Sequence, residues 1–394
     1  MPHFMKIHRA YKYRMYPNKQ QQQHLAVQFG HARFIFNYGL NARKQAYKET
    51  GKGLTYTATA LLLPKLKQEL PWLKEADSQV LQQKLKDLDT ASVNFFQGRT
   101  GYPVFKNKDD HQAVRFPQRF KLTDSHIYLP KVGWVALVLH RPTEGKMKNI
   151  TVSKTKSGKY FVSVLCELEI FEFSNNLTPV GVDLGLHHFA VLSTGEKIEH
   201  PACLRAAEKK LKRLQKALNR TKKGSANRAK ARRRVAVLHE KIANQRSDFL
   251  HKLSNRLVRS HGTIRLENLN VAGIVKCHNL AKSISDSGWS SFKLQCEYKA
   301  CQYGSSIKSV DRFFPSSKTC NVCGYVNNDL KLQHRFWTCP ECSAEHDRDI
   351  NAAINIRNFN TVGATELQAC GEDVRPTTFL GVGLTSMKQE AQRL

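Results

Sequence analysis

The chain has 394 residues, of which 63 are Lys or Arg and 32 are Asp or Glu, so its formal net charge is +31. Chains of this length usually form about two to four compact units rather than one. A charge of this size opposes compaction unless an anionic partner neutralises it, and nucleic acid is the usual partner. Because 41% of the residues are hydrophobic, the composition excludes a disordered basic tail protein.

Membrane and secreted locations are not expected. No apolar run approaches the ~18 residues that cross a bilayer, and residues 1–17 lack the apolar segment of a secretion signal. The ten cysteines are therefore expected to be reduced rather than paired in disulfides. We expect a soluble, cytoplasmic protein that binds an anionic partner and no membrane.

The first hundred residues predict a strand followed by helices. Basic and apolar side chains alternate over residues 8–17, a strand pattern that Pro17 ends. Asn18 can cap a helix, and a second helix is expected to close at Gly98. Residues 18–98 are therefore predicted to form a helical unit. The apolar stripes of the two helices are Leu25, Phe29, Ala32, Phe36 and Leu40, and Leu81, Leu85, Leu88 and Phe95.

After Gly101 the pattern changes to short alternating runs separated by turn residues. Several short strands at this spacing are typical of a small antiparallel barrel, which the N-terminal strand would join. The predicted strands cover residues 113–116, 126–130, 134–140, 149–154 and 160–170.

Residues 178–185 and 189–195 then predict an apolar strand pair, followed by two basic helices. Residues 205–234 hold fourteen Lys or Arg and one acid, with a hinge predicted at Gly224-Ser225. A solvated charged face is the alternative interpretation, but such faces normally mix both signs, so contact with phosphate is favoured. The candidate nucleic-acid-binding residues are Lys222, Lys223, Arg228, Arg232, Arg233 and Arg234.

Further strands are predicted over residues 263–271 and 306–314, and a helix over residues 351–359. Beyond about residue 360 the chain holds Gly, Thr and Pro without periodicity. We expect residues 361–394 to form a flexible C-terminal tail.

A cysteine cluster has the spacing of a zinc ribbon. Each C-x2-C pair can place two thiolates on one metal, and two pairs complete a closed, structural shell. Fifteen residues separate the pairs, and a module held this way needs almost no core of its own. Coincidental free cysteines are the alternative, and His346 could replace one ligand. The four expected zinc ligands are Cys320, Cys323, Cys339 and Cys342.

Three acids occur where a sheet-based nuclease would carry them. Asp183 lies inside an apolar strand, Glu267 ends another, and Asp349 precedes the last predicted helix. Each alone could be a helix cap or a surface charge. Together they suit phosphodiester hydrolysis, in which carboxylates from different elements hold two Mg²⁺ ions ~4 Å apart. Asp347 competes with Asp349, and the sequence geometry leaves both open.

The motifs GVDLG (181–185), RLENLNV (265–271) and SSKTCNVCG (316–324) with CPECSAEHDRDINAAINI (339–356) resemble those of the TnpB (OrfB) family. Members of this family are RNA-guided DNA nucleases of insertion sequences, related to type V CRISPR effectors. The resemblance covers nearly the whole chain. It implies that Asp183, Glu267 and Asp349 are catalytic, which favours Asp349 over Asp347, and that one zinc ion is bound by the four cysteines.

The resemblance also implies an α/β multidomain fold with an RNase H-like (RuvC) nuclease core. Its partners would be a guide RNA derived from the element end and double-stranded target DNA chosen by a short flanking motif. The host would be a bacterium or archaeon, with the protein at the nucleoid when bound to DNA. The implied parts are a wedge-like β-barrel at 1–17 and 99–177, a helical recognition domain at 18–98, a RuvC-like nuclease domain at 178–315 and 345–360, and a zinc-ribbon nucleic-acid-loading module at 316–344.

Three other functions stay open at this point. The same acids could serve a transposase that performs strand transfer. The chain could be a non-catalytic nucleic-acid-binding accessory protein or regulator, in which residues 18–48 would form a helix-turn-helix. A ribosome-associated zinc-ribbon protein is the third, but it would not need Asp183 and Glu267 on apolar strands.

Overall fold

The computed structural model describes residues 4–171, 177–274, 278–331 and 333–359. The tail predicted over residues 361–394 lies outside these ranges. The chain divides into two compact units: Met1–Glu172 with Leu204–Asn244, and Phe173–Cys203 with Gln245–Leu394. None of the described helices combines the length and the apolar content that spanning a lipid bilayer requires.

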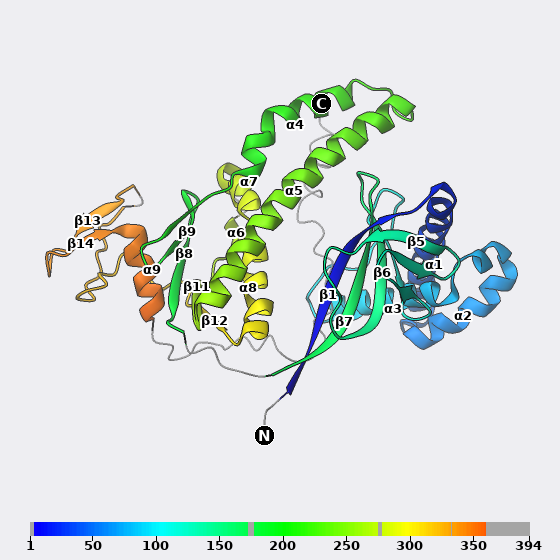
Figure 1. Ribbon diagram of the computed structural model, residues 1–394, viewed down its shortest axis with the longest axis horizontal. Coiled ribbons are helices and arrows are strands. Elements are labelled where there is room, and N and C mark those ends of the chain that lie inside the picture. The colour runs from blue at the N-terminus through cyan, green and yellow to red at the C-terminus, as the bar shows by residue number, and fades with distance from the viewer. Residues whose placement is uncertain (1–3, 172–176, 275–277, 332, 360–394) are drawn as a thin grey trace. The chain divides into compact units, whose positions relative to one another are not determined.

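A seven-stranded antiparallel sheet forms the centre of the first unit (Figure 1). The N-terminal strand joins this sheet, as predicted, and lies in its middle, because the order is β2-β6-β7-β1-β5-β4-β3. In the described residues no pairing joins the edge strands β2 and β3, so the sheet is open where the sequence predicts a closed barrel. The strands are β1 (Phe4–Tyr16), β2 (Gln112–Phe116), β3 (Lys121–Leu122), β4 (His126–Leu129), β5 (Gly133–Val138), β6 (Lys146–Lys154) and β7 (Tyr160–Phe171).

The helices that follow β1 begin as the sequence predicts. The Asn18 side chain accepts a hydrogen bond from the Gln21 N–H, and the Gln21 side chain accepts one from the Asn18 N–H. The predicted stripe of the first helix is buried, and part of it packs into the core of the sheet. The domain boundaries drawn at 18–98 and 99–177 stay predictions. These helices are α1 (Lys19–Thr50), α2 (Tyr56–Glu69), the 3₁₀ helix η1 (Pro71–Glu75) and α3 (Ser78–Phe96).

The two basic helices are α4 (Cys203–Asn219) and α5 (Ala226–Ser260), with the predicted hinge between them. Gly224 takes a φ of +84°, a left-handed conformation that glycine adopts without steric cost. Nearly all of α4 and the first part of α5 belong to the first unit, and α5 continues into the second.

The second unit contains a mixed five-stranded sheet. Its order is β10-β9-β8-β11-β12, with β8, β9 and β10 antiparallel and β11 parallel to both β8 and β12. The strand predicted over 263–271 ends at Glu267, and the short β10 was not predicted. The strands are β8 (Val180–Leu184), β9 (His188–Leu192), β10 (Lys197–Glu199), β11 (Thr263–Glu267) and β12 (Ser306–Val310).

Helices and a small ribbon complete this unit. Residues of α5 and α8 pack against the sheet in one core, which includes Phe189, Leu253 and Phe292. The sequence pattern predicts no element for residues 278–303, which form α7 and α8. The remaining elements are α6 (Val271–Ile274), α7 (His278–Ser287), α8 (Trp289–Tyr303), the antiparallel pair β13 (Phe336–Thr338) and β14 (Glu345–Asp347), and α9 (Arg348–Asn358).

Candidate nuclease and metal sites

Asp183 and Glu267 lie at the same edge of the five-stranded sheet. Strands β8 and β11 are parallel, and their register pairs Leu266 with Val182. Asp183 follows Val182 and Glu267 follows Leu266, so the two acids occupy matching positions on adjacent strands. Side chains at matching positions point to the same face of a sheet. Both side chains are partly exposed, whereas their strand neighbours Val182 and Leu266 are fully buried.

Asp349 is brought to this edge by the close packing of α9 on β8 (Figure 1). At Gly181 a Cβ atom would lie 2.0 Å from the carbonyl oxygen of Ala353 and 2.5 Å from the Arg357 nitrogen. Only glycine fits there, because any side chain would clash with the backbone of α9. Arg265 of β11 also donates a hydrogen bond to the Arg357 carbonyl, which fixes the far end of α9.

Two asparagines fix the other side of α9 to the cysteine module. Asn351 and Asn355 stand four residues apart, so they share one face of the helix. The Asn351 side chain donates to the Thr319 carbonyl and accepts from the Asn321 N–H, while the Asn355 side chain donates to the carbonyls of Ser316 and Thr319. The segment that leads into the first cysteine pair is thereby held against the helix that carries Asp349.

Asp347 has a different task from Asp349. Its side chain caps α9 by accepting hydrogen bonds from the Asp349 and Ile350 N–H groups, at 3.0 and 3.2 Å. It also pairs with Lys197 at 2.6 Å. Burial would raise the pKa of Asp347, but the hydrogen bonds from Lys197 and from the helix N–H groups lower it below its ordinary value. These contacts occupy Asp347 in capping the helix.

The acids at the sheet edge repel one another. Burial, followed by the neighbouring charges of Glu267 and Asp349, raises the pKa of Asp183 well above its ordinary value. Burial also raises the pKa of Glu267, although a hydrogen bond from the Ser316 hydroxyl at 2.8 Å opposes that shift. The raised pKa values of Asp183 and Glu267 mark a favourable place for a cation.

A pocket of about 100 Å³ opens at this place. Asp183 and Asp349 line it, and Glu267 is not among its lining residues. The donor atoms of the three acids do not all lie within 4.8 Å of one another, since among the described residues only a cysteine group meets that condition. The oxygen donors fit a hard ion such as Mg²⁺ in kind, and Mg²⁺ keeps several waters when few carboxylates bind it.

The pocket also holds residues that the sequence analysis missed. Arg335 precedes β13 and lies 3.2 Å from the Asp349 carboxylate, although half of its side chain is exposed. His187 and His188 line the same pocket. A lone arginine in an irregular segment carries no periodic signal, and only the fold brings it to Asp349.

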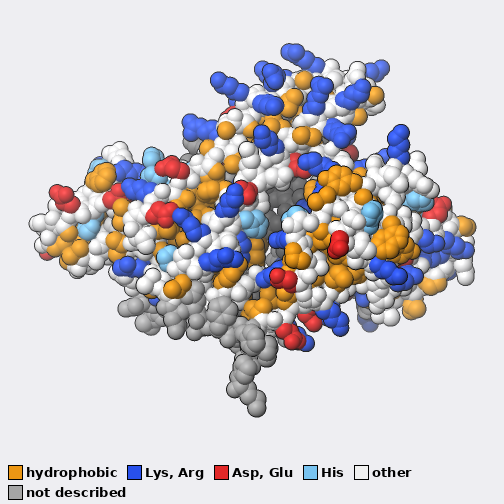
Figure 2. Space-filling model, viewed as in Figure 1, with side chains coloured by type: hydrophobic (Ala, Val, Ile, Leu, Met, Phe, Trp, Pro, Cys, Tyr) orange, Lys and Arg blue, Asp and Glu red, His pale blue; other side chains and the backbone are white. Residues whose placement is uncertain are grey.

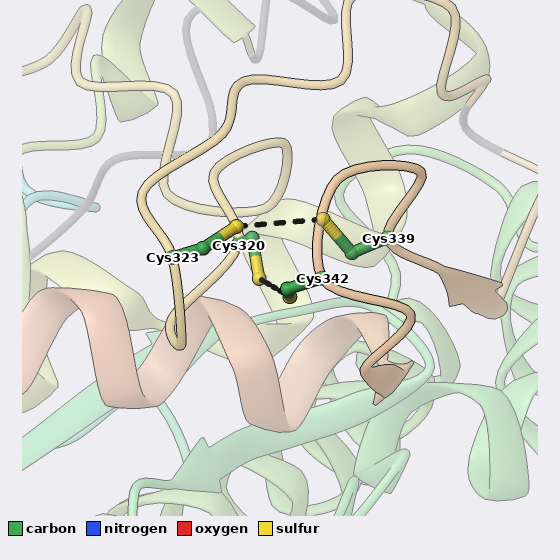
Figure 3. Close-up of side chains that lie close together, drawn as sticks. All are labelled: Cys320, Cys323, Cys339 and Cys342. Atoms are coloured by element: carbon green, nitrogen blue, oxygen red, sulfur yellow. Dashed lines mark hydrogen bonds between the residues drawn. The ribbon is translucent and has the colours of Figure 1, made fainter.

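The four cysteines predicted to bind zinc lie together in the second unit (Figure 3). Their sulfur atoms all fall within 4.8 Å of one another, with Cys320 to Cys342 at 3.7 Å and Cys323 to Cys339 at 3.5 Å. Burial would raise the pKa of the Cys339 thiol, but hydrogen bonds from backbone N–H groups of the second pair lower it to about 7. Four sulfur donors suit a closed tetrahedral zinc site.

His346 stands beside this group rather than replacing a member of it. Its Nε2 atom lies 3.0 Å from the Cys320 sulfur, and its ring packs on Trp337. A ring N–H that faces a metal-binding sulfur stabilises the thiolate form. The four cysteines therefore remain the candidate ligand set.

The predicted nucleic-acid-binding residues lie on the α4–α5 hairpin, where Lys and Arg side chains are dense (Figure 2). Lys222, Lys223 and Arg234 are exposed. Arg228 instead donates to the carbonyls of Leu218 and Thr221, which fastens the hinge. Three of these four residues are therefore exposed cations, and Arg228 stabilises the turn between the helices.

Arg232 and Arg233 have partners elsewhere in the same unit. Arg232 lies 3.5 Å from Asp109, and Arg233 donates to the Ser157 carbonyl at 3.0 Å. A groove of about 550 Å³ runs along this part of the hairpin. Its lining combines apolar and basic side chains: Lys210, Leu214, Lys230, Arg233, Arg234, Val237, Leu238 and Lys241.

Comparison with known families gives three matches along the chain. Residues 164–278 match the OrfB family described as "Probable transposase", and residues 289–356 match the family described as "Cas12f1-like, TNB domain". Residues 5–52 match a "Helix-turn-helix domain", yet they form nearly all of β1 and the whole of α1, a strand and one continuous helix. The helix-turn-helix considered over residues 18–48 is therefore not formed.

Two relatives match along nearly their whole length. A protein of Streptomyces pristinaespiralis named "Putative RNA-guided DNA endonuclease" is 39% identical over 98% of this chain and 97% of its own. The Escherichia coli protein named "Putative RNA-guided DNA endonuclease InsQ" is 34% identical over 94% of this chain and 96% of its own. A solved structure titled "Cryo-EM structure of the Cas12f1-sgRNA-target DNA complex" covers 90% of this chain and 99% of its own at 14% identity, with a TM-score of 0.49, a likeness too distant to bear on the fold.

Proposed function

Because this chain belongs to the OrfB (TnpB) family, we propose that it is the RNA-guided DNA endonuclease of a transposable element and that Asp183, Glu267 and Asp349 are its catalytic acids. The observation that carries the assignment of the acids is their meeting at one sheet edge, where burial and then the charges of Glu267 and Asp349 raise the pKa of Asp183. A structural role would not need three carboxylates crowded in one place, of which Asp349 is paired with Arg335.

The topology of the second unit supports an RNase H-like (RuvC) nuclease core. Three antiparallel strands are followed by two parallel ones, and the acids come from β8, from the end of β11 and from the start of α9. Two Mg²⁺ ions held by these acids would activate the attacking water and stabilise the departing 3′ oxygen. The chain itself orients the acids: Ser316 holds Glu267, and the packing at Gly181 sets the position of Asp349.

The cysteine module would bind one structural zinc ion and act in nucleic-acid loading. Asn351 and Asn355 fasten it to the helix that bears Asp349, so it would also help to position that acid. The exposed cations of the α4–α5 hairpin would hold nucleic-acid backbone without reading its sequence. In this proposal the guide RNA comes from the element end. The protein selects duplex DNA by a short flanking motif, and the guide then pairs with the target strand.

Single substitutions of the three acids test the proposal. In the RNA-bound protein, Asp183→Ala, Glu267→Ala and Asp349→Ala should each reduce Mg²⁺-dependent cleavage of guide-matched duplex DNA by about 10²–10³-fold or more. DNA and RNA binding should survive, because each substitution relieves crowding among the carboxylates and removes at most a contact with Ser316 or Arg335. Cleavage assays and gel-shift titrations on the same preparations measure both.

A guide of altered sequence is the matched control, because it should redirect cutting to the new target. Cleavage that persists in all three variants would show that the acids are structural. If the wild-type protein binds nucleic acid but does not cleave guide-matched DNA, the chain is instead the non-catalytic nucleic-acid-binding accessory protein or regulator.

A further inference from the structure

A cluster of exposed aromatic side chains in the first unit is not explained by the nuclease proposal. It lies where the segment after α3 passes α1. Phe96 is 82% exposed, Tyr102 46% and Phe105 45%. Large aromatic residues are usually buried, so a group of them on the surface marks a binding site.

The segment that carries these rings is held in place although it forms no helix or strand. The Asn37 side chain of α1 donates to the Lys106 carbonyl at 3.0 Å and accepts from the Lys106 N–H at 2.8 Å. Pro103 is buried between the exposed Tyr102 and Val104. The outward direction of the rings is therefore built into the free protein.

The rings and neighbouring cations support one another. Phe95 meets the edges of both Phe96 and Tyr102, with ring centroids 5.3 and 5.1 Å apart. The Lys44 ammonium lies 4.7 Å from the centre of the Phe105 ring and 5.4 Å from that of Tyr102. Such contacts fix the rings in place and put a positive charge among them.

The charge around the cluster is positive. Within the part of the chain that the structure describes, Lys44 forms no ion pair, while the nearby Asp89 is paired with Arg43 at 2.8 Å. Lys106 lies over the Phe36 ring at 4.2 Å.

We propose that Tyr102, Phe105 and Phe96, with Lys44 among them, form a stacking platform for unpaired bases of the guide RNA. Aromatic faces interleaved with cations fit nucleotides, whose bases stack while their phosphates meet the lysines. A protein or lipid partner would not require the interleaved charge. The rings stand ready in the free chain, which suits folded RNA with bases already unpaired, whereas duplex DNA must first be opened.

The identity of the RNA as a guide rests on the proposed function, but stacking can be measured without cleavage. The probe is a fluorescein-labelled oligouridine of about 12 nucleotides, long enough to fill one site. Its binding to the full chain is followed by anisotropy at low and high salt. High salt weakens phosphate contacts, so the stacking contribution stands out.

Tyr102→Ala combined with Phe105→Ala should weaken binding at high salt by about 5- to 150-fold for each base that loses its ring. Tyr102→Trp combined with Phe105→Trp should retain the wild-type affinity for the oligouridine at high salt. Trp134→Ala is the control, because it removes a ring of similar exposure (47%) from β5 of the same unit. This substitution should change the affinity for the oligouridine less than twofold. Unchanged melting temperatures establish that the exposed sites are not needed for folding.

Three outcomes would overturn the platform: wild-type affinity in the double alanine variant, an equal loss in Trp134→Ala, or a loss confined to single-stranded DNA of matching sequence. Loss of self-association with RNA binding intact would instead assign the surface to a protein partner. Asp183→Ala should bind the oligouridine as wild type does. Failure of the platform is therefore separable from failure of the nuclease assignment.

Discussion

At the residue scale, Asp347 and Asp349 show how two positions separate a cap from a candidate catalytic acid. Asp347 accepts the N–H groups that begin α9 and pairs with Lys197, while Asp349 lines the pocket with Asp183. Residue spacing alone does not rank the two acids, whereas the family resemblance of the motif favours Asp349. In the structure, the position of the first helical turn makes Asp347 the cap of α9 and places Asp349 in the pocket.

The two acids should respond differently to the same chemical change. Asp347→Asn keeps a capping side chain, so cleavage should fall less than about tenfold and stability by less than about 1 kcal/mol. Asp349→Asn should lose cleavage by at least about 10²-fold without loss of stability. Cleavage assays and thermal melts of both variants measure these effects. The reverse pattern would mean that Asp347 is the third catalytic acid.

Asp183 should also make the stability of the metal-free protein depend on pH. Its pKa is raised in the folded state, so above its ordinary value of 3.8 the folded chain keeps a proton that the unfolded chain has lost. Stability is therefore greatest at low pH in this window and falls as pH rises through the folded pKa. Denaturant melts in the absence of divalent ions should show this fall.

Asp183→Asn should flatten that pH dependence, because the amide does not titrate. Added Mg²⁺ should also reduce it, since bound cations favour the ionised carboxylates. An equal slope in wild type and variant would contradict the crowding of the three acids.

At the element scale, local signals predicted most strands and helices. The Asn18 cap, the buried stripe of α1 and the apolar runs of β8 and β11 follow from spacing and residue type alone. The sequence could not predict that β2 and β3 leave the first sheet open, because closure depends on pairing between distant edges. Helix α8 lacks a clear one-sided apolar stripe for a pattern to detect.

The helix α9 contacts both candidate metal sites through residues of one short sequence motif. Ala353 lies against Gly181, while Asn351 and Asn355 hold the backbone that enters the cysteine module. One face of α9 therefore contacts β8 through a small residue, and another face binds the cysteine module through amide side chains. The sequence predicted the helix and the acid, but the hydrogen bonds of the asparagines are long-range and carry no local signal.

Removal of zinc should therefore disable the nuclease indirectly. Treatment with 1,10-phenanthroline, which prefers zinc to magnesium, should release one zinc per chain and expose residues 316–347 to proteases. Cleavage should stay lost when Mg²⁺ alone is restored and should return when zinc is added. Metal analysis and limited proteolysis follow the two events. Full cleavage by a zinc-free protein would separate the module from the candidate active site.

At the scale of the whole molecule, charge and composition predicted the class of partner but not the geometry of the site. The net charge of +31 indicates a polyanion. The meeting of Asp183, Glu267 and Asp349 depends on the parallel strands β8 and β11 and on α9, which begins at Arg348, far along the chain from β8 at Val180–Leu184. Motif resemblance predicted these acids, and the contribution of Arg335 to their pocket required the fold.

The most direct test is a diffraction experiment on the complex with guide RNA and target DNA, with Mn²⁺ in place of Mg²⁺. Anomalous scattering should place manganese between the carboxylates of Asp183, Glu267 and Asp349, and Asp183→Ala should lose that signal. Manganese bound elsewhere, with these three side chains free of it, would contradict the assignment of the catalytic centre.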